Sequence, residues 1–333
     1  MADAAVTAPA SLAAWLAAAP AALVERPALG DPLAAYRHLP ARLRSVRDHL
    51  LAPPGADDAG AAGSMLSAGR QGEAAFAQWA AARFESECLG RRIAQMTTLA
   101  GWGGNTAARA AAAALATALA AAGAGGVELM LAKVPERDAL AGGVLREAGF
   151  AAIARKLTYY YMPGYSSEVA PIRARHAVRT YRPDDLDALV ALGRRFQHSQ
   201  YRRLPGVTGA AVDGLYERWI ERACAGEFAD TVLVAEAAGR PVAFSSFKGR
   251  ADTLAVTGLR VLGQGLGAVE PRASGALVAL ILTMRDLVDR GAYDAAEFDF
   301  YEENVAVRRA LERLGFRPVS SAAVMFLELQ QSG

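Results

Sequence analysis

The sequence predicts an α+β, or mixed α/β, fold made of two halves, with a helical arm before them. Segments of helical and strand periodicity interleave from Phe76 to the end of the chain. In the second half, two helix patterns precede a hairpin pattern at 231–250. The segment VLREAGFAAI at 144–153 also aligns with ALERLGFRPV at 310–319, which indicates a duplication. The alternative to a duplication is that a helix followed by Gly, Phe and a strand is a common local arrangement in proteins.

Length and composition limit the class of protein. The 333 residues are enough for two domains, and 53% hydrophobic with 21% charged residues form packed cores and argue against long disorder. The formal net charge of +2 is too small for binding driven by the phosphates of a nucleic acid. We therefore expect no nucleic-acid partner.

Cysteine usage and the N-terminus indicate the compartment. The two cysteines, Cys88 and Cys224, have no Cys or His at metal-ligand spacing, so we expect no disulfide framework, no metal site and a reducing, cytoplasmic location. The apolar stretch at 8–24 contains Pro9 and Pro20 and follows no basic cluster. It therefore predicts neither a signal peptide nor a membrane span.

Residues 1–66 are predicted to form an N-terminal helical arm and linker. An amphipathic helix is expected at 32–51, because apolar residues recur there at helical spacing: Leu33, Tyr36, Leu39, Leu43 and Val46. The run at 52–67 has the Pro, Gly and Asp content of a flexible linker. The apolar face of the arm would be buried either against the first half or against a second subunit in a homodimer.

The two folded halves are predicted at 67–165 and 166–333, because the polar segment 163–171, with its Gly and Ser residues, separates them. For the first half we expect, in order, an apolar segment at 93–99, a helix at 106–122, a strand within 125–135, a helix at 138–148 and a strand at 151–162. For the second half we expect a strand at 172–180, helices at 183–196 and 212–224, the hairpin, a strand at 253–261, a helix at 277–289, a strand at 297–301, a helix at 305–314 and a strand at 316–327.

The end of the chain carries a family pattern, formed by Asn304, Val307, Ala310, Leu314, Gly315 and Phe316. It resembles the last helix and strand of the GNAT acyltransferase superfamily, Asn-x-x-Ala-x-x-Leu-Tyr-x-x-x-Gly-Phe. The segment 215–244 and the stretch ARFESECLG at 82–90 are similar to TDP-fucosamine acetyltransferases and related sugar-biosynthesis enzymes. The resemblance covers roughly residues 76–329.

This resemblance implies two tandem GNAT-like domains, each a mostly antiparallel twisted sheet flanked by helices, and it implies an N-acyltransferase. The enzyme would move an acetyl or other acyl group from acetyl-CoA or another acyl-CoA to the amine of a small biosynthetic intermediate such as an amino sugar. The first half is expected to be a partial domain, because we find no glycine-rich strand-to-helix loop in it. The activity requires that two central strands of the second half part, so that they can hold the thioester.

The family binds the CoA pyrophosphate on a glycine-rich turn, where backbone N–H groups and a helix N-terminus face the phosphates. The residues that the resemblance implies for this site are Val269, Arg272, Ser274, Gly275, Ala276 and Asn304. The fit is partial, because Ser274 stands where a basic residue or Gln is usual and Leu277 stands where Gly is usual. These residues form the first of two possible registers, that is, alignments of the family's glycine pattern with this sequence. The second register, at 264–267, matches the glycines of the pattern better, but it would place Pro271 inside the next helix, at a cost of about 3 kcal/mol.

Amine acylation needs a base for the nucleophile and an acid for the leaving thiolate. The tyrosine that the family carries on its last helix falls at Leu311, which cannot donate a proton. In the strand EFDFYEEN, at 297–304, alternation places Asp299 and Tyr301 on one face, and we predict both as catalytic, with Tyr301 as the proton donor. The alternative is that the carboxylates are solvated and Tyr301 is packed.

The acceptor is expected at the segment RRFQHSQYRRLPG, residues 194–206. Arg195, Gln197 and Tyr201 are suited to an anionic or hydroxylated ligand, and His198 is a candidate base because histidine titrates near neutrality. The alternative function is a GNAT-fold protein with a degraded CoA loop. Such a protein would take acyl groups from an acyl carrier protein or act as a non-catalytic binding module.

Overall fold

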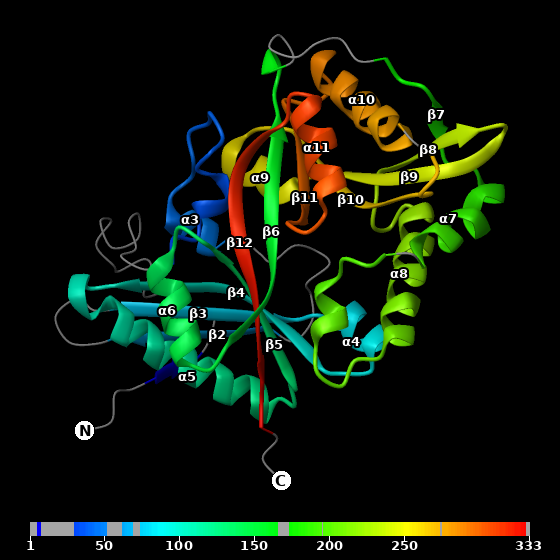
Figure 1. The fold of residues 1–333 in the computed structure, drawn as a ribbon. Coiled ribbons are helices and arrows are strands. Elements are labelled where there is room, and N and C mark those ends of the chain that lie inside the picture. The colour runs from blue at the N-terminus through cyan, green and yellow to red at the C-terminus, as the bar shows by residue number, and fades with distance from the viewer. Residues whose placement is uncertain are drawn as a thin grey trace. The chain divides into compact units, whose positions relative to one another are not determined.

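The computed structural model describes residues 5–7, 30–51, 62–68, 74–165, 173–194, 196–273 and 275–330. The chain forms two compact units (Figure 1): unit 1 comprises Met1–Ala154 and Ala322–Gly333, and unit 2 comprises Arg155–Ser321. The chain enters unit 2 within β6 (Ala151–Tyr161) and returns to unit 1 within β12 (Arg317–Glu328). The domain ranges 1–66, 67–165 and 166–333 stay predictions. Each of them is one continuous stretch of chain, whereas unit 1 of the structure also includes Ala322–Gly333.

The sheet of unit 1 has the strand order β1-β2-β3-β4-β5-β12. Its strands are β1 (Ala5–Thr7), β2 (Ala62–Ala68), β3 (Ala74–Ala81), β4 (Ile93–Trp102), β5 (Leu129–Pro135) and the end of β12. All neighbours are antiparallel except β4 and β5, which are parallel. Its helices are α4 (Arg83–Leu89), α5 (Ala107–Ala124) and α6 (Ala139–Glu147).

Among the described residues, helix α5 with the turn before it (Gly104–Ala124) is long and apolar enough to cross a membrane by length and composition alone. Its buried positions recur at helical spacing and pack in one cluster with residues of the sheet: Ala107, Ala110, Ala111, Ala114, Leu115, Ala118 and Ala122. The small side chains let the helix approach the sheet closely. A Cβ on Gly101 of β4 would lie 2.6 Å from the Ala107 carbonyl oxygen.

The aligned segments 144–153 and 310–319 have the same local structure. Gly149 follows α6 with a φ of +94°, and Gly315 follows α11 (Val305–Arg313) with a φ of +83°. The next residues, Phe150 and Phe316, are buried in the cores of units 1 and 2 respectively. Glycine is required because the chain reverses through a left-handed conformation, and the phenylalanine fills the space that this turn leaves.

The N-terminal arm differs from its prediction. Instead of one helix at 32–51, the structure has a 3-10 turn at Ala34–Tyr36 and a short α3 at Val46–Leu51. Pro40 explains the break, because it lacks an N–H and disfavours helical conformation in the residue before it. The predicted linker 52–67 is also partly wrong, since β2 pairs with β3 from Ala62; residues 52–61 lie outside the described residues.

The described part of the arm packs on unit 1. Gly30 lies against the backbone of Leu99 and Ala100 in β4, and the Ala34 carbonyl accepts a hydrogen bond from Arg137 beyond β5. Apolar residues of the arm are buried: Leu33, Ala34, Leu39, Val46 and Leu50. This agrees with the first of the two predicted places for the arm, and the homodimer stays a prediction.

We expect Gly30→Ala to loosen the arm. Gly30 has a φ of +64°, and a Cβ there would lie 1.5 Å from the Leu99 carbonyl oxygen, so the substitution adds a backbone clash to the left-handed strain. A loss of roughly 2–4 kcal/mol in unfolding free energy is expected. Gly90→Ala is the matched control: Gly90 has a φ of +67° with open space around it, and should lose about 1 kcal/mol. Urea unfolding measures both, and equal losses would contradict the contact with Leu99.

The sheet of unit 2 has the strand order β6-β11-β10-β9-β8-β7. The strands are β7 (Ala177–Thr180), β8 (Thr231–Ala237), β9 (Arg240–Gly249), β10 (Val261–Val269) and β11 (Ala295–Tyr301). Helices α7 (Leu186–Gly193) and α8 (Gly209–Cys224) precede the β8–β9 hairpin, as predicted, and α9 (Ala251–Thr257), α10 (Ala276–Asp289) and α11 follow. Residues of α10 and α11 form one core cluster with the sheet, and residues of α7 and α8 form another.

One strand prediction in unit 2 is wrong. Residues 253–261 were expected as a strand, but α9 occupies Ala251–Thr257 and the strand begins at Val261. Gly258 ends the helix in the left-handed conformation, with a φ of +77°. Gly263, Gly265 and Gly267 therefore lie in strand β10 and not in a loop. Its glycines admit close neighbours: a Cβ on Gly263 would lie 2.1 Å from Arg250 Nε, and one on Gly265 would lie 2.7 Å from Ser246 Oγ.

Candidate active site

The two central strands of unit 2 part, as the resemblance requires. Parallel pairing of β10 with β11 covers Val261↔Ala295, Leu262↔Ala296 and Gly263↔Glu297. Beyond these pairs β10 continues to Val269 beside β9, with a bulge between Gln264 and Gly267, while β11 continues to Tyr301 beside β6. We call this separation the splay of unit 2. Beyond Gly263 and Glu297, therefore, the backbone groups of β10 are not paired with β11.

The end of β10 and the start of α10 show which of the two predicted registers lies in the strand-to-helix turn. Strand β10 ends at Val269 and α10 begins at Ala276, so Pro271 lies in the turn and outside the helix. The first register therefore forms the strand-to-helix turn. The second register, 264–267, lies inside β10 and forms no such turn.

The predicted CoA-binding residues occupy different environments, and one of them, Asn304, lies outside this turn. Arg272 is exposed, Val269 is half-buried, and Gly275 precedes α10 with a φ of +91°. Ala276 is fully buried and its N–H donates to the Ala273 carbonyl (3.1 Å). Ser274 lies outside the described residues. Asn304 caps α11, where its side chain accepts from the Val307 N–H (3.3 Å).

Two basic residues that the sequence reasoning missed lie beside this turn. A Cβ on Gly275 would be 4.0 Å from Arg175 Cβ and Cδ and 3.9 Å from His176 Cδ2. Arg175 is exposed, and His176 is half-buried with Nδ1 3.2 Å from the Glu236 carbonyl oxygen. The signal in the sequence was the basic run Arg173 to His176, just before β7. These side chains therefore stand next to Gly275, the residue before α10.

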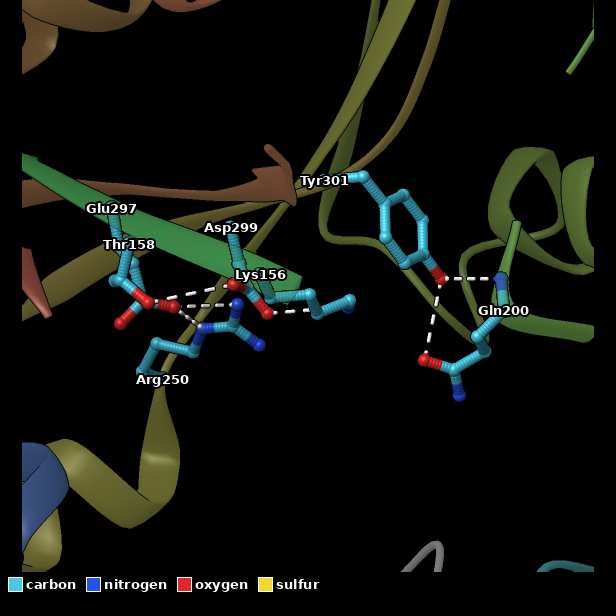
Figure 2. Close-up of polar contacts among 7 residues, drawn as sticks. All are labelled: Lys156, Thr158, Gln200, Arg250, Glu297, Asp299 and Tyr301. Atoms are coloured by element: carbon cyan, nitrogen blue, oxygen red, sulfur yellow. Dashed lines mark hydrogen bonds and ion pairs between the residues drawn. The ribbon is translucent and has the colours of Figure 1, made fainter. Parts of the chain in front are cut away.

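Strand β11 alternates as predicted. Phe298 and Phe300 are buried in the core, whereas Asp299 and Tyr301 lie on the other face. Pairing with β6 places Thr158 opposite Asp299 and Lys156 opposite Tyr301. Figure 2 shows these side chains together on one side of the sheet.

Asp299 accepts polar contacts from β6. Lys156 Nζ lies 3.3 Å from Asp299 Oδ2, and Thr158 Oγ1 lies 3.4 Å from Asp299 Oδ1. The side chain of Asp299 is 18% exposed and that of Lys156 is 24% exposed. Asp299 is therefore a partly desolvated carboxylate that already holds one primary ammonium.

Arg250, Glu297 and Tyr160 form a network at the closed end of the splay. Arg250 Nη2 lies 2.7 Å from Glu297 Oε1, and the Tyr160 hydroxyl donates to Glu297 Oε2 (2.5 Å). Burial, followed by the charge of Glu297, raises the pKa of Tyr160, so this hydroxyl stays protonated. The network holds Arg250 over Gly263, the last β10 residue paired with β11.

Tyr301 ends β11 with its hydroxyl against Gln200. This hydroxyl accepts from the Gln200 N–H (3.1 Å) and donates to Gln200 Oε1 (3.3 Å), as Figure 2 shows. Burial raises the pKa of Tyr301 to about 12, against the smaller lowering effect of the Gln200 N–H. Tyr301 is therefore protonated at neutral pH, which a proton donor must be.

The predicted acceptor segment lies against the end of β11. Gln200 contacts Tyr301, and Arg203 Nη2 lies 2.8 Å from Glu303 Oε1. The hydrogen bond from Arg203, with a smaller contribution from the charge of His198, holds the pKa of Glu303 below its usual value. The structure thus brings the predicted acceptor segment and the predicted catalytic strand together.

The individual acceptor residues are placed less uniformly. Gln197 and His198 are exposed, Tyr201 is buried, and Arg195 lies outside the described residues. Gln200, which touches Tyr301, was not predicted, because sequence spacing does not show which residue of a turn faces a strand. The roles of Arg195, Gln197, His198 and Tyr201 stay predictions.

Leu311, at the family's tyrosine position, is fully buried in the core of unit 2 beside Leu314 and Phe316. Its position is therefore structural. Among the residues that the structure describes, no group of three or more His, Cys, Asp or Glu could hold a metal ion.

Unit 1 repeats the splay, which corrects the prediction that its glycine-rich turn is missing. Strands β4 and β5 pair from Ile93↔Leu129 to Met96↔Ala132 and then part. The turn before α5 contains Gly103 and Gly104, with φ of +114° and +61°. The arm segment 30–34, however, runs from the unpaired end of β4 to the residues after β5. The arm therefore contacts β4 beyond its last pair with β5 and also the Arg137 side chain beyond β5.

Solved structures define the class of this fold. The chain matches a tandem GNAT protein from the clavulanic acid biosynthesis pathway over 99% of both chains, with a TM-score of 0.55 and 17% identity. A GCN5-related N-acetyltransferase from Sphaerobacter thermophilus matches over 86% of both chains, with a TM-score of 0.55 and 14% identity. A glucosamine N-acetyltransferase region in a fungal multi-domain GH3 β-N-acetylglucosaminidase matches 97% of this chain and 38% of that one, with a TM-score of 0.64 and 12% identity.

No family model and no curated protein sequence matches the chain. The structural matches nevertheless establish the architecture. The protein has the tandem GNAT fold, with both halves present in one chain, as the sequence resemblance predicted.

Proposed function

We propose that the protein is an N-acyltransferase that takes an acyl group from acyl-CoA and transfers it to a small amine at the splay of unit 2. The observation that carries this proposal is the splay itself, with a protonated, half-buried Tyr301 and the carboxylate of Asp299 on the same face of β11. In unit 1 the arm lies against the unpaired end of β4, which favours unit 2 as the reacting half.

The turn from β10 to α10 supports binding of the CoA phosphates. A helix N-terminus attracts anions because its first N–H groups lack partners within the helix. Arg175 and Arg272 add exposed positive charge beside Gly275 and within the turn. The thioester would then lie along the unpaired part of β10, whose backbone groups are not used by β11.

The reaction follows from the groups on β11. Asp299 would hold the acceptor ammonium and remove a proton, so that the nitrogen lone pair can attack the thioester carbonyl. Tyr301 would protonate the sulfur as the C–S bond breaks. The glucosamine N-acetyltransferase named in the fungal match supports an amino sugar as the acceptor class. An acyl carrier protein in place of free acyl-CoA is the alternative donor.

Acetyl-CoA binding tests the proposal. A ligand that binds the native state alone must raise the unfolding temperature, so millimolar acetyl-CoA should stabilise the protein. Arg175→Ala should raise Kd roughly fivefold, about 1 kcal/mol, because it removes one exposed charge near the phosphates, and added salt should shrink the difference. The matched control is Arg146→Ala, an exposed arginine on α6 of unit 1. No thermal shift with acetyl-CoA would overturn acyl-CoA use, and a shift with an acyl carrier protein would then favour the alternative donor.

A further inference from the structure

Lys156 places a primary amine at the face where the proposed acceptor binds. It lies on β6 opposite Tyr301, with Nζ 3.3 Å from Asp299 Oδ2 and 5.2 Å from the centroid of the Tyr301 ring. These are the two side chains to which the proposed function assigns the base and the acid. Figure 2 shows the lysine chain reaching along the sheet to the carboxylate, between Asp299 and Tyr301.

Lysine is scarce in this chain. Of 36 basic Lys and Arg residues, three are lysines: Lys133, Lys156 and Lys248. An arginine would form an ion pair with Asp299 equally well and usually with better geometry, but its guanidinium stays protonated and does not attack a thioester. A lysine amine becomes a nucleophile when it loses a proton. The choice of lysine at this position therefore has a chemical consequence.

The other two lysines lie in different surroundings. Lys133 is an exposed residue of β5 in unit 1. Lys248, on β9, donates from Nζ to the Glu227 carbonyl oxygen (3.3 Å). Lys156 is thus the lysine that contacts the groups proposed to carry out acyl transfer.

We propose that Lys156 is an internal acyl acceptor, so that the protein acylates itself at this residue when acyl-CoA is bound and no free amine competes. The proposal rests on the proposed function of the unit 2 splay. The Lys156 ammonium first loses one proton to solvent by way of Asp299. The Nζ–C bond to the acyl carbon then forms, the C–S bond breaks, and the thiolate takes a proton from Tyr301.

The step balances without an added reagent. The tyrosinate regains its proton from the nitrogen, which keeps one hydrogen in the new amide, and the products are acyl-Lys156, free CoA thiol and one released proton. The new amide carries no charge, so the ion pair with Asp299 is lost. Asp299 is then available for the ammonium of a free acceptor.

Mass spectrometry of the full-length protein tests this inference. The wild type is incubated with acetyl-CoA in the absence of any added amine, and its acetyl groups are counted on the intact chain and located by peptide mapping. Acetyl phosphate serves as a chemical donor that does not use the CoA site. We expect one acetyl group at Lys156 from acetyl-CoA, at a rate at least tenfold above Lys133 and Lys248.

Variants separate enzymatic transfer from chemical reactivity. Lys156→Arg keeps the charge beside Asp299 and should abolish the acetyl group, whereas the matched Lys248→Arg should leave it unchanged. Tyr301→Phe should slow acetylation of Lys156 by acetyl-CoA but not by acetyl phosphate. Circular dichroism of each variant confirms that the fold is retained.

The outcomes separate this inference from the proposed function. A thermal shift with acetyl-CoA but no acetyl group at Lys156 overturns the inference and leaves acyl-CoA use standing. Equal modification of all three lysines, or equal rates with both donors, also overturns it. No thermal shift and no acetyl group overturn both.

Discussion

Tyr301→Phe is expected to lower kcat for acyl transfer roughly 10²–10⁴-fold, the usual contribution of a positioned general acid. The substitution removes only the hydroxyl group, and with it the proton for the leaving thiolate. Because Tyr301 holds Gln200 through this hydroxyl, a smaller change in KM is also expected. Steady-state kinetics with acetyl-CoA and glucosamine as the amine measure both parameters.

The pH dependence gives a second readout for Tyr301. Burial raises its pKa to about 12, so the donor should stay protonated across the neutral range and activity should not fall with rising pH on its account until far into the alkaline range. Tyr159→Phe is the matched control. Its hydroxyl also has a pKa raised to about 12 by burial, but it donates to Glu312 on the other face of the sheet (2.9 Å). Equal kcat values for Tyr301→Phe and the wild type would eliminate the proton-donor role.

Asp185→Asn is expected to reduce the unfolding free energy by roughly 3 kcal/mol, because it leaves a partly buried arginine without its main partner. Arg179 Nη1 lies 2.7 Å from Asp185 Oδ2, and the carboxylate also accepts from the Arg182 N–H (2.8 Å). The Asp185 side chain is 7% exposed. The expected loss of unfolding free energy is at the lower end of the range for breaking a buried ion pair, because Arg179 keeps a second partner. Its Nη2 lies 2.6 Å from Glu236 Oε1.

This stabilisation depends on pH in a known direction. The hydrogen bonds from Arg179 lower the pKa of Asp185, against the opposing effect of burial. A carboxyl with a lowered native pKa stabilises the fold above its unfolded pKa, near 4, and loses that contribution as the pH falls through the native value. The difference between the wild type and Asp185→Asn should therefore shrink in acid.

Urea unfolding at neutral and acid pH measures this difference. Asp184→Asn is the control, since Asp184 is the exposed neighbour in the same turn and should change stability by about 0.5 kcal/mol. If Asp185→Asn and Asp184→Asn lose the same free energy, the ion pair with Arg179 contributes nothing specific.

The sequence by itself determined the features that depend on local pattern. The alternation of apolar and polar residues from Phe298 to Tyr301 predicted which side chains face the core, because neighbouring strand residues must point to opposite sides. The helix, Gly and Phe of the two aligned segments predicted the same turn twice, because a left-handed reversal strongly favours glycine. Together with the family resemblance, the alternation allowed Asp299 and Tyr301 to be proposed for the site.

Tertiary structure decided what depends on neighbours distant in the chain. Gly263 and Gly265 lie in a strand that pairs with β9, where Arg250 and Ser246 leave no room for a Cβ, and nothing within that run of sequence indicates these neighbours. The pairing of β6 with β11 placed Lys156 beside Asp299, and the packing of the acceptor segment selected Gln200 for Tyr301. The local sequence pattern determines to which face of the sheet each side chain points. Which residues it contacts there depends on the register of the strands and the packing of the loops.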